Sequence, residues 1–358
     1  MLAPLLAASA ALVLPEAPGI IRKCVPLLPG GPSSCTVGNP EDECSLTRLA
    51  TGNTNRLYCL SRERGDRFLV REFGTESALP FDRVAENAAF AQLSEAGLAP
   101  PLLATFNGGR IEGWLEGGPV DVEACRSPAV YEQVARALAA LHAFELERPP
   151  AAAYRRPAGD VPWGWQAALS WLPVAMEHRR EVARGAKAAQ YARRVEALEL
   201  AGVGERLEDL MATLDERDPP RCFCHNDLSN TNLHLDPGTG LVRLIDFEYG
   251  GLNFRGFDLA THLTHWAGGA EDGLYDDDNF PSDELMRRFL SAYAAAAADA
   301  PTVDALVEEV RLCAPLAHCV WGLWAVCSLP DEEGGTPFSH IEYAERRLGA
   351  FESLMTDL

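Results

Sequence analysis

The sequence predicts an α+β protein with two lobes, a small antiparallel sheet near the N-terminus and a larger helical lobe after it. Short segments between residues 45 and 73 are apolar or alternate between apolar and polar residues, which is typical of strands. After residue 127, long stretches repeat apolar residues at helical spacing around one β segment at 232–247. This order favours a sheet lobe stacked on a helical lobe.

The first lobe is expected to span residues 44–117. Asp82 should cap a helix that Gly97 ends, because a short carboxylate can accept the first helical N–H groups and glycine readily adopts the left-handed backbone at a helix end. Residues 98–106 should then return as a strand. The strands before that helix are expected at 45–49, 56–60 and 68–73.

The second lobe is expected to span residues 118–358. Ser127 and Pro128 stand in the right order for a helix cap and a first helical residue, and apolar residues follow at helical spacing. Further helices are expected at 165–184, 188–214, 283–298, 303–328 and 340–354.

Residues 1–43 are predicted to be a leader that precedes the folded lobes. The apolar run from Leu2 to Leu14 is shorter than the ~20 residues that span a bilayer, and no basic residue precedes Arg22. Residues 30–43 are rich in Gly, Pro, Ser and acids, as linkers are. We expect a poorly ordered leader on a cytoplasmic protein, with organelle targeting as the alternative.

Composition excludes several classes of partner. The formal charge of −21 repels nucleic acid and anionic lipid surfaces, while it attracts small cations. No other stretch approaches membrane length, so no stable membrane span is expected. The ten cysteines show no CxxC spacing, which favours buried reduced thiols over disulfides or a zinc site. The oligomeric state is left open, a homodimer included.

The most informative stretch runs from residue 224 to 258. It predicts a hairpin over 233–245, closed by a turn rich in Asp, Pro and Gly. Because a hairpin brings its open ends together, Asn232 and Asp246 should lie side by side, with Asp227 five residues upstream of Asn232.

These three side chains match the needs of phosphoryl transfer from ATP. The reaction requires oxygen ligands that hold Mg²⁺ on the phosphates and a carboxylate that accepts the proton of the attacking hydroxyl. Asp227 is the candidate base, and Asn232 and Asp246 are the candidate metal ligands. The alternative is that all three serve as structural caps and turn carboxylates.

At this point the chain resembles the choline/ethanolamine kinase family, through the segments HNDLSNTN and LIDFEYGGLNFRGFDLATH. The resemblance extends from about residue 46 to 351. It implies the bilobal fold of protein kinases and aminoglycoside phosphotransferases, and Mg²⁺-dependent transfer from ATP to a small amino alcohol. For ethanolamine, that reaction begins the CDP-ethanolamine route to phosphatidylethanolamine.

The resemblance also assigns an ATP site in the first lobe. It implies that the turn TGNTNRLY approaches the phosphates through backbone N–H groups, and that Arg71 contacts them while pairing with Glu86. The alternatives are a structural turn and a surface ion pair. The turn residues are Gly52, Asn53, Thr54 and Asn55.

Substrate residues are implied in the same way. Trp321 and Trp324 stand three residues apart on one helix face, and the resemblance implies that they line the amino-alcohol pocket with Tyr249 and Tyr343. Without the resemblance, such a Trp pair would be assigned to the core. His265 is included because it stands where the family has a glutamate.

Departures from the family pattern bear on the substrate. Thr261 and His265 replace Asn and Glu, which removes a carboxylate and favours choline; the hinge also departs, with Glu112 and Gly113. The overall pattern resembles ethanolamine kinases more closely, so ethanolamine is favoured and choline is second. The alternatives are an aminoglycoside kinase and a catalytically silent binding protein. His225 is interpreted as a residue that orients the loop.

Overall fold

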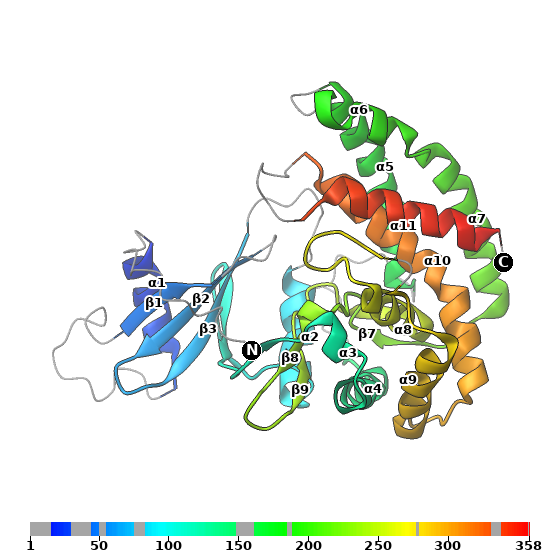
Figure 1. The fold of residues 1–358 in the computed structure, drawn as a ribbon. Helices are drawn as coiled ribbons and strands as arrows, with labels where there is room; N and C mark the ends of the chain where they lie inside the picture. The colour runs from blue at the N-terminus through cyan, green and yellow to red at the C-terminus, as the bar shows by residue number, and fades with distance from the viewer. Residues whose placement is uncertain are drawn as a thin grey trace. The chain divides into compact units, whose positions relative to one another are not determined.

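The computed structural model describes residues 16–29, 44–49, 55–74, 83–147, 161–184, 188–276, 279–330, 338–356 and 358. The chain divides into two compact units: Met1–Ser77 with Leu93–Leu115, and Ala78–Gln92 with Glu116–Leu358. The first contains an antiparallel sheet, and the second is mostly helical (Figure 1). The predicted α+β class is therefore confirmed.

The first unit is built on a five-stranded antiparallel sheet in the order β1–β2–β3–β5–β4. The first three strands match the predicted segments, whereas β5 has no predicted counterpart and residues 98–101 lie outside any strand. β5 escapes prediction because its sequence GRIEG has a single large apolar residue. The strands are β1 (Cys44–Arg48), β2 (Asn55–Arg62), β3 (Arg67–Phe73), β4 (Leu102–Phe106) and β5 (Gly109–Gly113).

A helix from the predicted leader packs against this sheet. α1 (Ala17–Cys24) and the short 3-10 turn η1 (Val25–Leu27) place Ile20 and Ile21 in one apolar cluster with Tyr58 of β2. Residues 16–29 are thus a folded part of the first unit, in contrast to the poorly ordered leader that we expected. The rest of residues 1–43 lies outside the described residues, and the predicted lobe boundaries stay predictions.

Ten α-helices, α2 to α11, are described in the second unit, although the end of α2 belongs to the first unit. The predicted single helix over 188–214 is wrong, because the chain forms two helices that are interrupted at Leu198 and Glu199. Asp82, the predicted cap of α2, lies outside the described residues. The helices are α2 (Arg83–Glu95), α3 (Val122–Cys125), α4 (Pro128–His142), α5 (Trp163–Arg184), α6 (Ala188–Ala197), α7 (Leu200–Arg217), α8 (Arg255–Thr264), α9 (Asp283–Ala296), α10 (Val303–Ser328) and α11 (His340–Met355).

The helix α10 forms the centre of this unit. It packs against α5, α8 and α11, and most of its apolar residues are buried. By length and composition it is the one described helix that could cross a membrane, but 78% of its apolar window is buried inside the protein. Its hydropathy is therefore accounted for by its place in the core.

Two small antiparallel sheets complete the second unit. β6 (Gly118–Pro119) pairs with β8 (Leu233–Leu235), which forms the predicted hairpin with β9 (Val242–Leu244). The Asp236 side chain accepts hydrogen bonds from the backbone of Gly238 and Thr239, which fixes the turn. The second sheet pairs β7 (Arg221–Cys224) with β10 (Gly251–Phe254).

We predict that Ile21→Ala destabilises the protein by about 2 to 4 kcal/mol, because it removes a buried side chain and leaves a cavity beneath α1. Denaturant unfolding of the full chain measures this change. Lys23→Ala, on the exposed side of the same helix, should change stability by less than about 0.5 kcal/mol. Equal effects of the two substitutions would show that α1 does not contribute to the core.

Candidate active site

The hairpin β8–β9 gathers the three residues predicted to carry the chemistry. Just beyond its last strand pair, the Ile245 N–H donates to the Asn232 carbonyl oxygen at 3.0 Å, so Ile245 lies opposite Asn232 and Asp246 is the next residue. The Asn232 side-chain Nδ2 donates to Asp227 twice, to Oδ2 at 3.0 Å and to the backbone oxygen at 2.8 Å. The structure therefore joins Asp227 to Asn232 at the open end of the hairpin, with Asp246 beside them.

Asp227 lies among other acids. Its pKa is raised well above the usual value, first by removal from water and then by the negative charges of Asp246 and Glu248. The hydrogen bond from Asn232 and the positive charge of Arg347 act in the opposite direction. A carboxylate with a raised pKa is a better proton acceptor, and crowded acids favour a bound cation.

The residues fit a magnesium ion. Both hydrogen bonds of the Asn232 amide use Nδ2, which leaves its Oδ1 oxygen available as a ligand. Asp246 adopts a left-handed backbone with φ of 64°, at the residue where the chain leaves β9 and must turn. An amide oxygen and a carboxylate are ligands that Mg²⁺ prefers.

A buried carboxylate holds the loop that carries Asp227. Asp258, in the first turn of α8, is fully buried and accepts the backbone N–H groups of His225 and Asn226, each at 2.6 Å. His142, at the end of α4, approaches the same carboxylate through Nε2 at 3.2 Å. Asp258 was not among the predicted site residues, although it lies in the GFD part of the segment LIDFEYGGLNFRGFDLATH.

His225 has the loop-orienting position that we predicted for it. Its Nε2 lies 2.8 Å from the Ile245 carbonyl oxygen, and its ring packs on Phe247 with centroids 4.7 Å apart. Burial lowers its pKa, so the ring is neutral and donates to that carbonyl. The contact ties the loop before Asp227 to the strand that leads to Asp246.

The four aromatic residues predicted to bind substrate share one cluster. The rings of Tyr249 and Trp321 lie 5.2 Å apart, those of Trp321 and Trp324 5.9 Å, and those of Trp324 and Tyr343 6.3 Å, between centroids. Tyr249 also lies near Asp227, whose charge contributes, after burial and Glu248, to raising the tyrosine pKa. Trp324 is the member of the four that is partly exposed.

Two residues of this cluster were not anticipated. Trp163 and Trp171, both on α5, contact Tyr249 with centroids 5.7 Å and 6.3 Å apart. They come from a helix far upstream in the sequence, and no short motif links them to the IDFEY segment. Only the tertiary packing of α5 against α10 brings them there.

His265 lies against a buried arginine instead of among these rings. Its Nε2 accepts from Arg347 Nη2 at 3.2 Å, and the same Nη2 donates to the Tyr343 hydroxyl at 2.8 Å. Burial and the Arg347 charge hold the pKa of His265 well below its usual value, so it is neutral. Arg347 is fully buried, and its Nε and Nη1 have no hydrogen-bond partner among the described residues.

The predicted ATP-binding residues of the first unit are described in part. Gly52, Asn53 and Thr54 lie outside the described residues, while Asn55 is the buried first residue of β2. Arg71 is buried on β3.

Glu112, predicted at the hinge, lies on β5 and pairs with Arg71. Its Oε1 accepts from Arg71 Nε at 3.1 Å and from Arg110 Nε at 2.8 Å. Glu86, on α2 in the second unit, accepts from Arg83 Nη1 at 2.6 Å. Arg71 and Glu86 belong to different units, so their pairing and the ATP-contacting role stay predictions.

Comparison with known proteins finds the same pattern over most of the chain. The family model "Choline/ethanolamine kinase" matches residues 46–352. A probable ethanolamine kinase A of Dictyostelium discoideum is 27% identical over 87% of this chain and 85% of its own length. A probable choline kinase 2 of Arabidopsis thaliana is 27% identical over 82% of this chain and 81% of its own length.

The fold has solved relatives as well. The structure of an ethanolamine kinase from Plasmodium vivax superimposes with a TM-score of 0.74 at 22% identity, covering 87% of this chain and 84% of the other. At this identity the likeness establishes the fold alone, and it confirms the predicted kinase-like class.

We predict that Asp227→Asn lowers the turnover of ATP-dependent phosphorylation by about 10² to 10⁴, because the amide cannot accept the hydroxyl proton. Steady-state kinetics should show a smaller kcat with little change in the KM for ATP. Asp209→Asn, an exposed carboxylate on α7, is the matched control and should leave kcat unchanged. A kcat for Asp227→Asn within about threefold of the parent would remove Asp227 from the mechanism.

Proposed function

The chain belongs to the choline/ethanolamine kinase family, and from this premise we propose that it transfers the γ-phosphoryl group of ATP to the hydroxyl of ethanolamine, with choline as the alternative substrate. The observation that carries the proposal is the contact between Asp227 and Asn232 at the open end of the hairpin, beside Asp246 and the aromatic cluster. The product is phosphoethanolamine.

Asp227 acts as the general base in this proposal. The substrate oxygen attacks the γ-phosphorus, its proton passes to the Asp227 carboxylate, and the bond from phosphorus to the bridging oxygen breaks to release ADP. The Asn232 amide holds Oδ2 of Asp227, which leaves Oδ1 to face the hydroxyl. The hydrogen bonds from the backbone N–H groups of His225 and Asn226 to Asp258 hold the loop in place while the proton moves.

Asn232 Oδ1 and the Asp246 carboxylate are the groups that would hold magnesium, which supplies neutralisation of the phosphate charge. Arg71, which pairs with Glu112 within the first unit, is the basic residue to which we assign the ATP phosphates. A charged, planar guanidinium suits this role because it donates two parallel hydrogen bonds to phosphate oxygens.

The aromatic cluster is the proposed site of the substrate ammonium. A cation over an aromatic face gains about 0.5 to 2 kcal/mol, depending on how far both are removed from water. Trp324 is partly exposed, so its ring is accessible to a ligand, and Tyr249 links the cluster to Asp227. The substrate hydroxyl would thus reach the base while its ammonium contacts the rings.

The preference for ethanolamine rests on the sequence pattern, which resembles that of ethanolamine kinases more closely than that of choline kinases. The ring centroids of the predicted set lie 5.2 to 6.3 Å apart, an ordinary spacing for packed aromatic rings that selects neither substrate. Relatives with either substrate in their names match this chain at the same 27% identity, so overall similarity does not separate the two substrates.

A substrate panel tests the proposal. We expect release of ADP with ethanolamine at the highest kcat/KM, a lower value with choline, and none with an aminoglycoside. A value for choline equal to or above that for ethanolamine would make the protein a choline kinase. Absence of ADP release with every compound would favour the catalytically silent binding protein.

We further predict that His265→Glu raises kcat/KM for ethanolamine by about three- to tenfold, because the new carboxylate neutralises a buried cation near the ammonium site. The KM for ATP should be unchanged. His265→Gln keeps a hydrogen-bond acceptor without the charge, so it should stay within about twofold of the parent. Equal kinetics for the two variants would exclude the charge of Arg347 as a determinant of substrate binding.

A further inference from the structure

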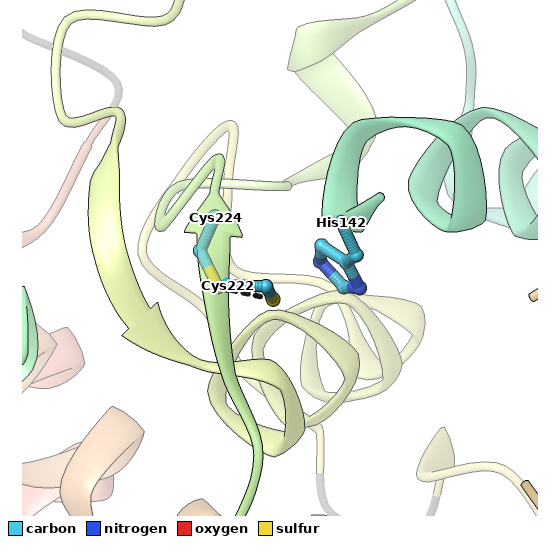
Figure 2. A group of neighbouring side chains, drawn as sticks. All are labelled: His142, Cys222 and Cys224. Atoms are coloured by element: carbon cyan, nitrogen blue, oxygen red, sulfur yellow. Dashed lines mark hydrogen bonds between the residues drawn. The ribbon is translucent and has the colours of Figure 1, made fainter. Parts of the chain in front are cut away.

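Two thiols and an imidazole form a cluster directly behind the loop that carries Asp227. Cys222 and Cys224 occupy alternate positions of β7, so their side chains point to the same face of the strand (Figure 2). Their sulfur atoms lie 3.6 Å apart. The donor atoms of His142, Cys222 and Cys224 all lie within 4.8 Å of one another.

Such a group first suggests a metal site, but the hydrogen bonds of His142 do not suit a metal ligand. His142 Nδ1 is hydrogen-bonded to the Tyr293 hydroxyl at 2.7 Å, and its Nε2 to Asp258 at 3.2 Å. Both ring nitrogens are therefore engaged, and neither has a lone pair directed at a metal beside the sulfurs. Two cysteines alone do not complete a zinc site, so thiol chemistry is the better interpretation.

The surroundings of Cys222 favour a reactive thiolate. Burial lowers the pKa of His142, but the charge of Cys222, the hydrogen bond with Asp258 and the charge of Asp258 outweigh it, so the net shift of the pKa is upward. The hydrogen bond with Cys224 lowers the pKa of Cys222 against the effect of burial, and His142 and Arg255 lower it further. The carboxylate of Asp258 opposes them.

Other buried thiols of the chain provide an internal comparison. Burial raises the pKa of Cys319 and of Cys327 to about 12, and among the described residues no cation offsets this rise. They are expected to be inert. Cys222 also differs in exposure: it is partly accessible to solvent, whereas Cys319, Cys327 and its neighbour Cys224 are buried.

We propose that Cys222 and Cys224 form an oxidisable dithiol, in which Cys222 attacks a small-molecule disulfide and Cys224 resolves the mixed disulfide, and that closing this bond slows phosphoryl transfer. In the first step, the Cys222 thiolate bonds to one sulfur of the oxidant and releases the other as a thiolate. In the second, the Cys224 thiol, whose pKa burial raises well above its usual value, passes its proton to the departing sulfur as it attacks the Cys222 sulfur, and the second thiol is released. The protein dithiol is oxidised, and one disulfide is reduced to two thiols.

The position of the pair explains the effect on catalysis. β7 is extended and pairs Cys224 with Gly251 and Cys222 with Asn253. The Cα atoms of a disulfide most often lie about 5.5 to 6 Å apart, whereas alternate residues of a strand lie about 6.4 to 6.8 Å apart, so closing the bond favours a contracted β7. His225 follows Cys224 directly, and its backbone N–H is held by the same Asp258 that contacts His142, so the contraction displaces the loop before Asp227.

Mass spectrometry after brief exposure to glutathione disulfide tests the chemistry. Trypsin cleavage after Arg221 and Arg243 gives a peptide whose only cysteines are Cys222 and Cys224. We expect this peptide to lose two hydrogen atoms, and in Cys224→Ser to gain one glutathione at Cys222 instead. Modification should be about tenfold faster than at Cys44, a partly exposed thiol on β1. A peptide that stays reduced, or equal rates at the two sites, would overturn the dithiol.

Kinase assays test the consequence separately. After exposure to glutathione disulfide, the kcat of the parent protein should fall by about tenfold or more and recover with dithiothreitol. The kcat of Cys222→Ser should fall by less than about twofold after the same treatment. Cys44→Ser is the matched control and should respond as the parent does. An oxidised peptide with unchanged kcat would refute the effect on catalysis, and stoichiometric zinc that is lost in Cys222→Ser would assign the cluster to a metal. The peptide measurement does not depend on which amino alcohol is phosphorylated.

Discussion

The geometry of the second unit depends on the hydrogen bonds made by the buried carboxylate of Asp258. Removing a carboxylate from water is costly unless hydrogen bonds satisfy it, and here two backbone N–H groups and His142 do so. The bonds join α8, α4 and the loop that follows β7. A single side chain thus fixes the backbone of His225 and Asn226, the two residues before the candidate base.

The charges that act on Asp227 come from several groups and not from one ion pair. Asp227, Asp246 and Glu248 crowd together, and Arg347 opposes their effect on Asp227 from a fully buried position. A neutral His265 is the neighbour of Arg347, so the arginine charge is left to act on its surroundings. This arrangement differs from the glutamate that the family resemblance implies at that position, and the effect that we predict for a charge at residue 265 follows from it.

Local patterns in the sequence predicted those parts of the structure that depend on neighbours in the chain. The hairpin, its turn and most helices follow from turn residues and periodicity, and the contact of Asp227 with Asn232 follows from the hairpin. The strand β5, the tryptophans of α5 and the role of Arg347 depend on distant packing. A buried arginine in the segment EYAERR cannot be distinguished from an exposed one by its spacing.

The helix α1 has a practical consequence for recombinant work. The family match begins at residue 46, two residues after β1 begins, so a truncation placed by similarity alone would delete α1 and cut into β1. The apolar face formed by Tyr58, Leu60 and Val70 would then be open to water. An uncovered sheet face of this kind promotes aggregation, so an expression boundary upstream of Glu16 is the sound choice for purification.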